Sequence, residues 1–391
     1  MKNFCIISEF NPFHNGHEYL IKKARELGAD TVTCVMSGNA TQRGELAIVD
    51  KYVRAEATIK SGADLVLELP FPWSSSSAEF FGAAGVSIAK CFGDVLLFGS
   101  ESGDIDMLKK AAAYSESEEF RAGYTERTQR GEGSAAAYCD CLHSFGIAEL
   151  SSNDLLGVAY IKAIEKQRAA LEVMTVKRIG AAYNSERIEK EIFQSATALR
   201  RCIAEGNESA KEYMPSIMWE LICREAEIGR VTDISRLDAL ILGYFRLKDK
   251  EEISGFAECD GGIGNRICDL AHKCTSAQEL FSELRTKRYT DAKLRRAVLY
   301  ALTGATEKDI RTFPEYTLLL GASTRGRELL ANKKRESDVR VITKPADAPV
   351  GTRQYEIAFG LEGIFTLARE NRGTTGEHLR KKAYIEIDEK T

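Results

Sequence analysis

The sequence has no run of about 18 consecutive apolar residues, the length that a helix needs to cross a lipid bilayer. Its first residues also lack the basic stretch followed by an apolar stretch that marks a secretory signal peptide. Hydrophobic residues make up 44% of the chain and charged residues 29%, values typical of a folded globular protein. These features predict a cytoplasmic protein without a membrane-spanning segment.

Cysteine pairs with metal-site spacing are missing as well. The ten cysteines are scattered over 391 residues, and none forms the Cys-x-x-Cys pair of structural zinc sites. The nearest sets are Cys139 with Cys141, and Cys268 with Cys274 around His272. We therefore expect reduced, mostly buried thiols, and we predict no metal site.

Positive charge is not in excess, because the net charge is −4. A nucleic-acid partner is therefore not indicated by the total charge, and any RNA contact must rely on local clusters of Lys and Arg. No internal repeat, low-complexity segment or Pro-rich linker divides the chain. Nothing in the sequence indicates an obligate protein partner.

Short apolar runs alternate with helical patterns through the first two hundred residues. The predicted strands are 4–7, 31–36, 64–69, 95–98 and 174–179, and the predicted helices between them are 16–27, 52–60, 77–90 and 152–164. This alternation predicts an α/β fold, a Rossmann-like doubly wound parallel sheet, over residues 1–205. Helical patterns dominate 206–391, so we predict a mainly α-helical second domain there. Ligands of such sheets bind beyond the carboxyl ends of the strands, so the loops at 8–17, 37–45 and 99–103 should face one crevice.

A tight turn joins the first predicted strand to a helix that carries His14-Asn15-Gly16-His17 at its start. The amides at a helix N-terminus are unpaired and attract anions, and two imidazoles three residues apart share one face of the helix. Gly16 removes a Cβ that would keep a phosphate away from the backbone. The pattern favours a triphosphate site. A zinc site would need further His or Cys ligands, which are scarce nearby, and a purely structural role fits the turn poorly.

A second helix start, Ser195 to Arg200, has hydroxyls at Ser195 and Thr197 and a guanidinium one turn later. Hydroxyl groups there cap the helix and can also bind a phosphate, to which arginine adds a forked cation. Taken alone, the segment is only a capped helix. Together with the histidine pair it becomes a second candidate phosphate site.

His14-Asn15-Gly16-His17 after a first strand resembles the HxGH signature of the nucleotidylyltransferase superfamily. The wider sequence resembles one branch of it, the bacterial tRNA(Met) cytidine acetate ligases. The matching segments are 9–17, 36–39, 42–45, 64–70, 98–101, 152–157, 177–180 and 195–200, with a weaker likeness at 287–290 and 294–296.

The resemblance implies catalytic roles for His14 and His17. It implies an ATP site formed by Ile7, Ser8, Glu9, Phe10, Asn11, Pro12, Phe13, His14, Asn15, Gly16, His17, Glu18, Tyr19, Leu20, Gly99, Asn153, Arg178, Ile179, Ser195, Thr197 and Arg200. Without the resemblance, Asn153 is simply a residue of a helix cap and Arg178 a surface charge. Whether Asn153 or Asp154 faces the nucleotide is left open, because the family often has two Asn at this place.

Two further segments are candidates for the other substrates. The polar loop 37–45 follows a strand and could form an acetate pocket or guide an RNA end, or be only a connection. The basic stretch 285–296 and the cluster 333–335 could bind phosphates of RNA, although such charge runs are often only solvated helix faces. The residues predicted to contact tRNA are Lys287, Arg288, Arg295, Arg296, Lys333, Lys334 and Arg335.

The resemblance implies an enzyme that activates acetate with ATP as acetyl-adenylate, releases pyrophosphate, and acetylates N4 of the wobble cytidine of elongator tRNA(Met). Mg²⁺ is expected with the triphosphate, although no carboxylate is an obvious ligand and Glu9 is a thin candidate. One alternative is a small-molecule nucleotidylyltransferase of cofactor synthesis, and another is a non-catalytic RNA-binding protein. An aminoacyl-tRNA-synthetase-like ligase would need a KMSKS loop, which the sequence lacks.

Overall fold

A computed structural model describes residues 1–147, 150–178, 195–286, 288–333 and 337–387. At its centre lies a sheet in which the strands follow the order β5-β4-β1-β2-β3-β6-β7, with β8 also paired to β6. The strands are β1 (Asn3–Ser8), β2 (Thr31–Ser37), β3 (Leu65–Leu69), β4 (Val95–Ser100), β5 (Glu172–Lys177), β6 (Tyr316–Ala322), β7 (Arg340–Ile342) and β8 (Tyr384–Ile385).

The five strands predicted from the first half of the sequence are all present, and they pair with one another in parallel, while β3 has an antiparallel partner, β6, on its other side. They are apolar on both faces because helices cover both sides of the sheet. One cluster of buried side chains includes Cys5 and Ile7 of β1, whereas the opposite cluster includes Phe4 and Ile6. This alternation with a period of two is the expected consequence of strand geometry.

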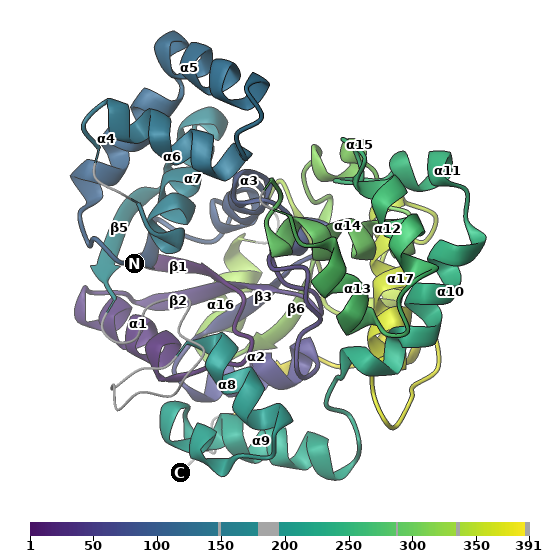
Figure 1. Cartoon of the computed structure of the whole chain (residues 1–391). Coiled ribbons are helices and arrows are strands. Elements are labelled where there is room, and N and C mark those ends of the chain that lie inside the picture. Colours follow the sequence, from purple (N-terminus) through teal and green to yellow (C-terminus); the bar gives the residue numbers. More distant parts are fainter. Residues whose placement is uncertain (148–149, 179–194, 287, 334–336, 388–391) are drawn as a thin grey trace.

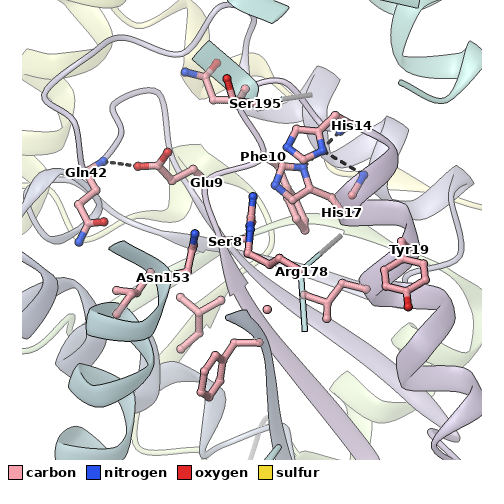
Figure 2. A pocket seen from close by; sticks show the side chains of 18 of the residues that line it. Ser8, Glu9, Phe10, His14, His17, Tyr19, Gln42, Asn153, Arg178 and Ser195 are labelled. Carbon is pink, nitrogen blue, oxygen red and sulfur yellow. Dashed lines mark hydrogen bonds between the residues drawn. The ribbon is translucent and has the colours of Figure 1, made fainter. Parts of the chain in front are cut away.

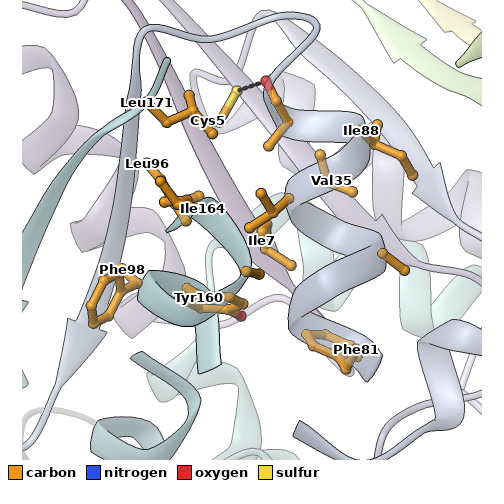
Figure 3. Close-up of a cluster of buried hydrophobic side chains, with 14 of the residues drawn as sticks. Cys5, Ile7, Val35, Phe81, Ile88, Leu96, Phe98, Tyr160, Ile164 and Leu171 are labelled. Carbon is orange, nitrogen blue, oxygen red and sulfur yellow. Dashed lines mark hydrogen bonds between the residues drawn. The ribbon is translucent and has the colours of Figure 1, made fainter. Parts of the chain in front are cut away.

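Helices α3 (Ala78–Ala89), α4 (Ile105–Ser115), α7 (Ser152–Gln167) and α16 (Thr324–Lys333) contribute to the first cluster. Figure 3 shows part of it, where Phe81 of α3 and Tyr160 of α7 lie near Ile7. The opposite face is covered by α1 (Asn15–Glu26), α2 (Lys51–Lys60), α8 (Ala196–Ala204) and α9 (Ser216–Glu227). Helices α5 (Glu118–Gln129) and α6 (Ser134–Ser144) extend away from the sheet beside α4 (Figure 1).

The remaining helices form a region with its own core on one side of the sheet (Figure 1). They are α10 (Asp238–Leu247), α11 (Lys250–Ser254), α12 (Ile263–Ala271), α13 (Ala277–Leu284), α14 (Asp291–Thr303), α15 (Glu307–Ile310) and α17 (Arg353–Leu367). A further buried cluster joins this helical region to the sheet region, and it includes Ala40, Phe71, Tyr300 and Leu361.

The second half of the chain also contributes strands to the central sheet. Strand β6 runs antiparallel to β3, with Val66 opposite Gly321, while β7 and β8 run parallel to β6. The fold is therefore a mixed α/β sheet surrounded by helices. In the chain, the helical region lies mainly between β5 and β6, and α17 lies between β7 and β8. The division at residue 205 stays a prediction. Among the described residues, no helix combines the length and the hydropathy that a membrane crossing requires.

Candidate active site

A cavity lies beyond the carboxyl ends of the central strands, where the sequence places the ligand (Figure 2). It encloses about 1320 Å³ of space free of protein atoms, including its open mouth. All three predicted loops come near it, since Glu9, Gln42 and Gly99 contribute to its lining. The predicted residues that line it are Ile7, Ser8, Glu9, Phe10, Asn11, His14, Gly16, His17, Tyr19, Leu20, Gly99, Asn153, Arg178, Ser195, Thr197 and Arg200.

Four other predicted residues do not line the cavity. Pro12 and Phe13 are buried, and Phe13 belongs to the hydrophobic core below the turn. Asn15 donates a hydrogen bond to the carbonyl of Glu212 at 3.1 Å, and Glu18 pairs with Lys22 at 2.8 Å. These four residues support α1 and its turn. Ile179, also predicted to bind ATP, lies outside the described residues.

The two histidines organise each other at the start of α1. His14 is the N-cap, and its Nδ1 accepts a hydrogen bond from the amide of Gly16 at 3.1 Å. The amide of His14 in turn donates to Nδ1 of His17 at 3.2 Å. The two rings stack with their centroids 3.7 Å apart. This reciprocal arrangement is a capping box made of imidazoles, and it fixes both rings on the cavity side of the helix (Figure 2).

Both imidazole rings are neutral, and each has its proton on Nε2. Burial and the nearby guanidinium groups of Arg178 and Arg200 lower the pKa of His14 from 6.5 to about 3. Burial also lowers the pKa of His17 well below its ordinary value. Because Nδ1 of each ring accepts a hydrogen bond, the single proton of each neutral ring is on Nε2. The pair therefore presents two N–H donors that keep their protonation state at neutral pH.

Gly16 lines the cavity, and its lack of a side chain also matters for the cap of α1. A Cβ at this position would lie 3.0 Å from Cε1 and 3.1 Å from Nδ1 of His14. The glycine therefore leaves room for the capping ring to fold over the first turn. The space it preserves is next to the imidazole, and the predicted close approach of a phosphate to this backbone stays a prediction.

The second predicted phosphate segment begins α8 and faces the histidine pair across the cavity. Ser195 is the N-cap, and its Oγ accepts a hydrogen bond from the amide of Ala198 at 3.2 Å. Arg200, one turn later, donates to the backbone carbonyl of Asn11 at 2.9 Å and pairs with Glu45 at 2.6 Å. These contacts direct the guanidinium toward the turn that follows β1.

Another side of the cavity is formed by residues 39–48, the 39–48 loop. Arg43 donates to Oγ1 of Thr197 at 2.9 Å, which joins this loop to α8. The amide of Gln42 donates to the carboxylate of Glu9 at 2.7 Å (Figure 2). Burial raises the pKa of the Glu9 carboxyl, while the charges of Arg200 and Arg43 oppose that rise.

Asn153 and Asp154 have separate roles at the start of α7. Asn153 lines the cavity, and its Nδ2 donates to Glu101 at 2.6 Å. Asp154 is buried and accepts hydrogen bonds from Ser102 Oγ at 2.6 Å and from the amide of Ser151 at 3.2 Å. Asp154 therefore caps the helix, and Asn153 is the residue that can reach a nucleotide.

Arg178 approaches the same side of the cavity from the end of β5. Its Nε lies 3.6 Å from the carboxylate of Glu101, so Glu101 orients both Asn153 and Arg178. A Cβ on Gly99 would lie 3.3 Å from Cγ of Arg178, so the glycine lets the arginine stem pass over β4.

Several lining residues were missed by the sequence analysis. The polar ones are Gln42 and Arg43, in a loop that was predicted only as a possible site, and Lys177 at the end of β5. An apolar side of the cavity consists of Phe81, Phe98, Leu156, Tyr160 and Val176. These residues belong to ordinary core patterns of helices and strands, and no local signal distinguishes them from the rest of the core.

The residues predicted to contact tRNA occupy different environments. Arg288 is exposed and lies over the ring of Tyr289, with 5.3 Å between them, and Lys333 ends α16 at a half-buried position. Arg295 pairs with Glu45, and Arg296 is only 7% exposed. The guanidinium of Arg296 is used inside the protein, so we do not include it in an RNA-binding surface. Lys287, Lys334 and Arg335 lie outside the described residues.

The described residues do not fit a resident metal ion. They contain no group of three or more His, Cys, Asp or Glu side chains that could hold one. Glu9, the thin candidate for a Mg²⁺ ligand, accepts a hydrogen bond from Gln42 and lies near Arg43 and Arg200, whose positive charges disfavour a cation there. We therefore assign no protein side chain to Mg²⁺.

Comparison with known proteins identifies the class. The sequence model of the HIGH nucleotidyl transferase family matches residues 1–377, and the chain belongs to this family. Its curated relatives include proteins named tRNA(Met) cytidine acetate ligase. The relative from Acetivibrio thermocellus is 33% identical over 95% of this chain and 96% of its own length. The relative from Thermosipho africanus is 35% identical over 88% of this chain and 85% of its own length.

Solved structures agree with these relatives. The apo crystal structure of Thermotoga maritima TmcAL has a TM-score of 0.91 with 27% identity, and covers 98% of this chain and 99% of that one. A second crystal structure of the same protein, bound with alpha-thio ATP, has a TM-score of 0.89 with 28% identity. It covers 98% of this chain and all of the other.

Proposed function

We propose that this protein is a tRNA acetate ligase that activates acetate with ATP and transfers the acetyl group to N4 of the wobble cytidine of elongator tRNA(Met). The observation that carries the proposal is the pair of neutral imidazoles at the start of α1, facing Ser195, Thr197 and Arg200 across one cavity. The relatives named for this reaction, and the T. maritima protein solved with alpha-thio ATP, support the choice of substrates.

In the first step, a carboxylate oxygen of acetate attacks the α-phosphorus of ATP and the bond to the β-phosphate oxygen breaks. Pyrophosphate leaves and acetyl-adenylate remains. Acetate is already ionised at neutral pH, so the step needs no general base. The Nε2–H groups of His14 and His17 donate to the phosphoryl oxygens, on which negative charge develops in the transition state. ATP would enter as its Mg²⁺ complex, with the metal ion held by the phosphates and water.

In the second step, the exocyclic N4 amine of cytidine attacks the acetyl carbon. The bond from that carbon to the phosphate oxygen breaks, AMP leaves, and the nitrogen loses one proton. Acetyl-adenylate is a reactive anhydride, so the cavity has to limit water between the two steps. Its apolar side, which includes Phe81, Phe98 and Leu156, suits that requirement.

A second cleft offers a route for the RNA. It lies between α8 and the helical region, and it shares Thr197 and Arg200 with the ATP cavity. Arginines from both sides line it, among them Arg201, Arg236 and Arg285. An unpaired anticodon base could thus approach the activated acetyl group while the backbone phosphates contact arginines.

The test supplies purified protein with ATP, labelled acetate and an elongator tRNA(Met) transcript. The RNA is then digested, and N4-acetylcytidine is measured by mass spectrometry. A transcript with uridine at the wobble position is the matched control. We expect labelled N4-acetylcytidine only with ATP and only from the cytidine transcript. Pyrophosphate release without incorporation of acetate would instead favour nucleotidyl transfer to another small molecule, and ATP binding without pyrophosphate release would favour a non-catalytic protein.

A further inference from the structure

Arg296 of α14 is buried, and its side chain is hydrogen-bonded to the 39–48 loop. Its Nε and Nη2 donate to the two carboxylate oxygens of Glu258, each at 2.9 Å. Its third nitrogen, Nη1, donates to the backbone carbonyl of Gln42 at 3.0 Å. All three nitrogens of the planar fork are therefore engaged within the protein.

The contact continues from Gln42 into the cavity. Gln42 accepts a hydrogen bond from Arg296 at its carbonyl, and its own amide donates to Glu9 at 2.7 Å. Glu9 belongs to the turn that leads to the histidine pair and lines the cavity. The position of this turn is thus linked to α14 through a single residue of the loop.

Arg295, the preceding residue of α14, provides a second link. It pairs with one carboxylate oxygen of Glu45, while the other oxygen lies 2.6 Å from Arg200. Arg200 then donates to the carbonyl of Asn11. Two consecutive arginines of the helical region therefore reach both the turn after β1 and the phosphate segment of α8.

The loop and α14 are in direct contact at Gly44. This residue has a φ of +71°, a conformation that glycine adopts readily. A Cβ at Gly44 would lie 2.5 Å from the backbone nitrogen of Arg296 and 2.8 Å from the carbonyl carbon of Arg295. Only a glycine allows the loop to approach the backbone of the helix so closely.

We propose that Arg295 and Arg296 are positioning residues of the nucleotidyl-transfer site, which they complete by holding the 39–48 loop, Glu9 and Arg200 in place. The inference rests on the proposed function for its assay, and it assigns these arginines to adenylation, which precedes any contact with RNA. An RNA-contact role for the same residues makes different predictions, so the two can be separated.

The discriminating experiment measures acetate-dependent exchange of labelled pyrophosphate into ATP in the absence of RNA. Lysine can replace an arginine that only supplies charge, but it cannot replace a fork with three directed hydrogen bonds. We expect Arg296→Lys to lower kcat/KM for exchange by about tenfold or more and to raise the KM for ATP, because the loop and Glu9 shift. A simple loss of folded protein would lower kcat without changing KM.

Arg295 forms one ion pair, with Glu45, and a lysine at this position should keep it. We expect Arg295→Lys to stay within about threefold of the wild-type kcat/KM and Arg295→Met to fall by about tenfold. Lys308→Met, which removes an exposed cation from α15 of the same region, is the matched control and should leave the exchange unchanged.

The proposal is overturned if Arg296→Lys exchanges within about twofold of wild type while its melting temperature is preserved, since the fork would then be dispensable. If Arg296→Lys does not fold, Gly44→Ala tests the same contact from the loop side and should give the same rise in KM. If the wild-type protein shows no acetate-dependent exchange, the proposed function fails. Calorimetric binding of alpha-thio ATP to wild type and Arg296→Lys then decides the positioning role by itself, with equal affinities counting against it.

Discussion

Two sides of one cavity are built in opposite ways. The histidine side, His14 to His17, is organised by hydrogen bonds between residues two and three positions apart. The 39–48 loop has hydrogen bonds of its own, such as the one from the amide of Ala47 to the carbonyl of Asn39 at 2.9 Å, but it is attached to the rest of the molecule by partners that are far away in sequence. Gln42 is bonded to a residue 254 positions later, and Asn39 donates to Glu362, which is 323 positions later, at 3.0 Å.

The two sides differ in which parts of the chain must be folded before each can form. The histidine pair needs only a strand, a turn and the first turn of a helix, so its donors are set by local geometry. The hydrogen bonds from the loop to Arg296 and Glu362 can form only when α14 and α17 have packed against the sheet region. The site therefore combines a self-sufficient group of phosphate donors with a side whose geometry depends on the whole chain.

The largest effect is expected from a substitution that disrupts the support of the 39–48 loop. Lys51 is buried between Glu68 and Glu362, with Nζ 2.8 Å from each carboxylate, and its amide donates to Asn39. Lys51→Met leaves two buried carboxylates without a cation, and we expect it to lower the free energy of unfolding by about 3–5 kcal/mol in urea denaturation.

The same helix offers the matched control. Lys60 forms an exposed i,i+4 pair with Glu56, so Lys60→Met should change the free energy of unfolding by less than about 0.5 kcal/mol. Equal effects of the two substitutions would mean that the buried network does not hold the loop.

The second prediction concerns the histidine side, where one substitution should remove a donor without unfolding the protein. His17→Gln keeps an oxygen that can accept the hydrogen bond from the amide of His14, as glutamine does in ordinary capping boxes. It replaces the Nε2–H of the fixed ring by an amide NH2 on a flexible chain, so the preorganised donor is lost. We expect adenylation to fall by about 10²- to 10³-fold, the usual cost of removing one preorganised donor. The melting temperature should stay within a few degrees. A nearly active His17→Gln enzyme would show that the fixed ring donor of His17 is not required for adenylation.

The third prediction concerns pH. The folded protein keeps His14 and His17 neutral, with the pKa of His14 lowered to about 3, whereas the unfolded chain protonates both rings near 6.5. Below about pH 6.5 the unfolded state therefore binds more protons, so stability falls as the pH falls. The expected slope is roughly 1.4 kcal/mol per pH unit for each histidine.

Other groups also titrate in this range, so the histidine contribution is obtained by difference. Urea unfolding of wild type and His17→Gln at several values between pH 4.5 and 7 provides the comparison. The variant, with one buried histidine fewer, should have the flatter profile. Identical slopes would mean that His17 is protonated in the folded protein.

The smallest expected effects distinguish the roles of Asn153 and Asp154 at the start of α7. Asn153→Ala removes a cavity donor and should raise the KM for ATP about three- to tenfold, with stability unchanged. Asp154→Ala removes the cap and should lower the free energy of unfolding by about 1 kcal/mol, with the KM for ATP unchanged. Enzyme kinetics and urea denaturation on the two variants check both outcomes. The opposite pattern would mean that Asp154 is the nucleotide contact.

The same contrast explains how much could be predicted from the sequence. The parallel strands, the histidine pair and the cap of α8 depend on short patterns, and the structure contains them. The contact between Gly16 and the ring of His14 could not be predicted, because the pattern does not show where that ring folds. Arg296 looked like part of a basic surface, since its partner Glu258 and its contact with Gln42 exist only in three dimensions.

The chain order of the sheet has a consequence for the protein during synthesis. Strand β3 gains its neighbour β6 late, as the bond from Thr317 Oγ1 to the carbonyl of Glu68 spans 249 residues. At 5–20 residues per second, a ribosome needs roughly 12–50 s to make that interval. For that time the apolar edge of β3 is open to pairing with another chain. A fragment ending at residue 205 would keep this edge permanently, so we expect it to aggregate, whereas the complete chain closes the edge with its own last third.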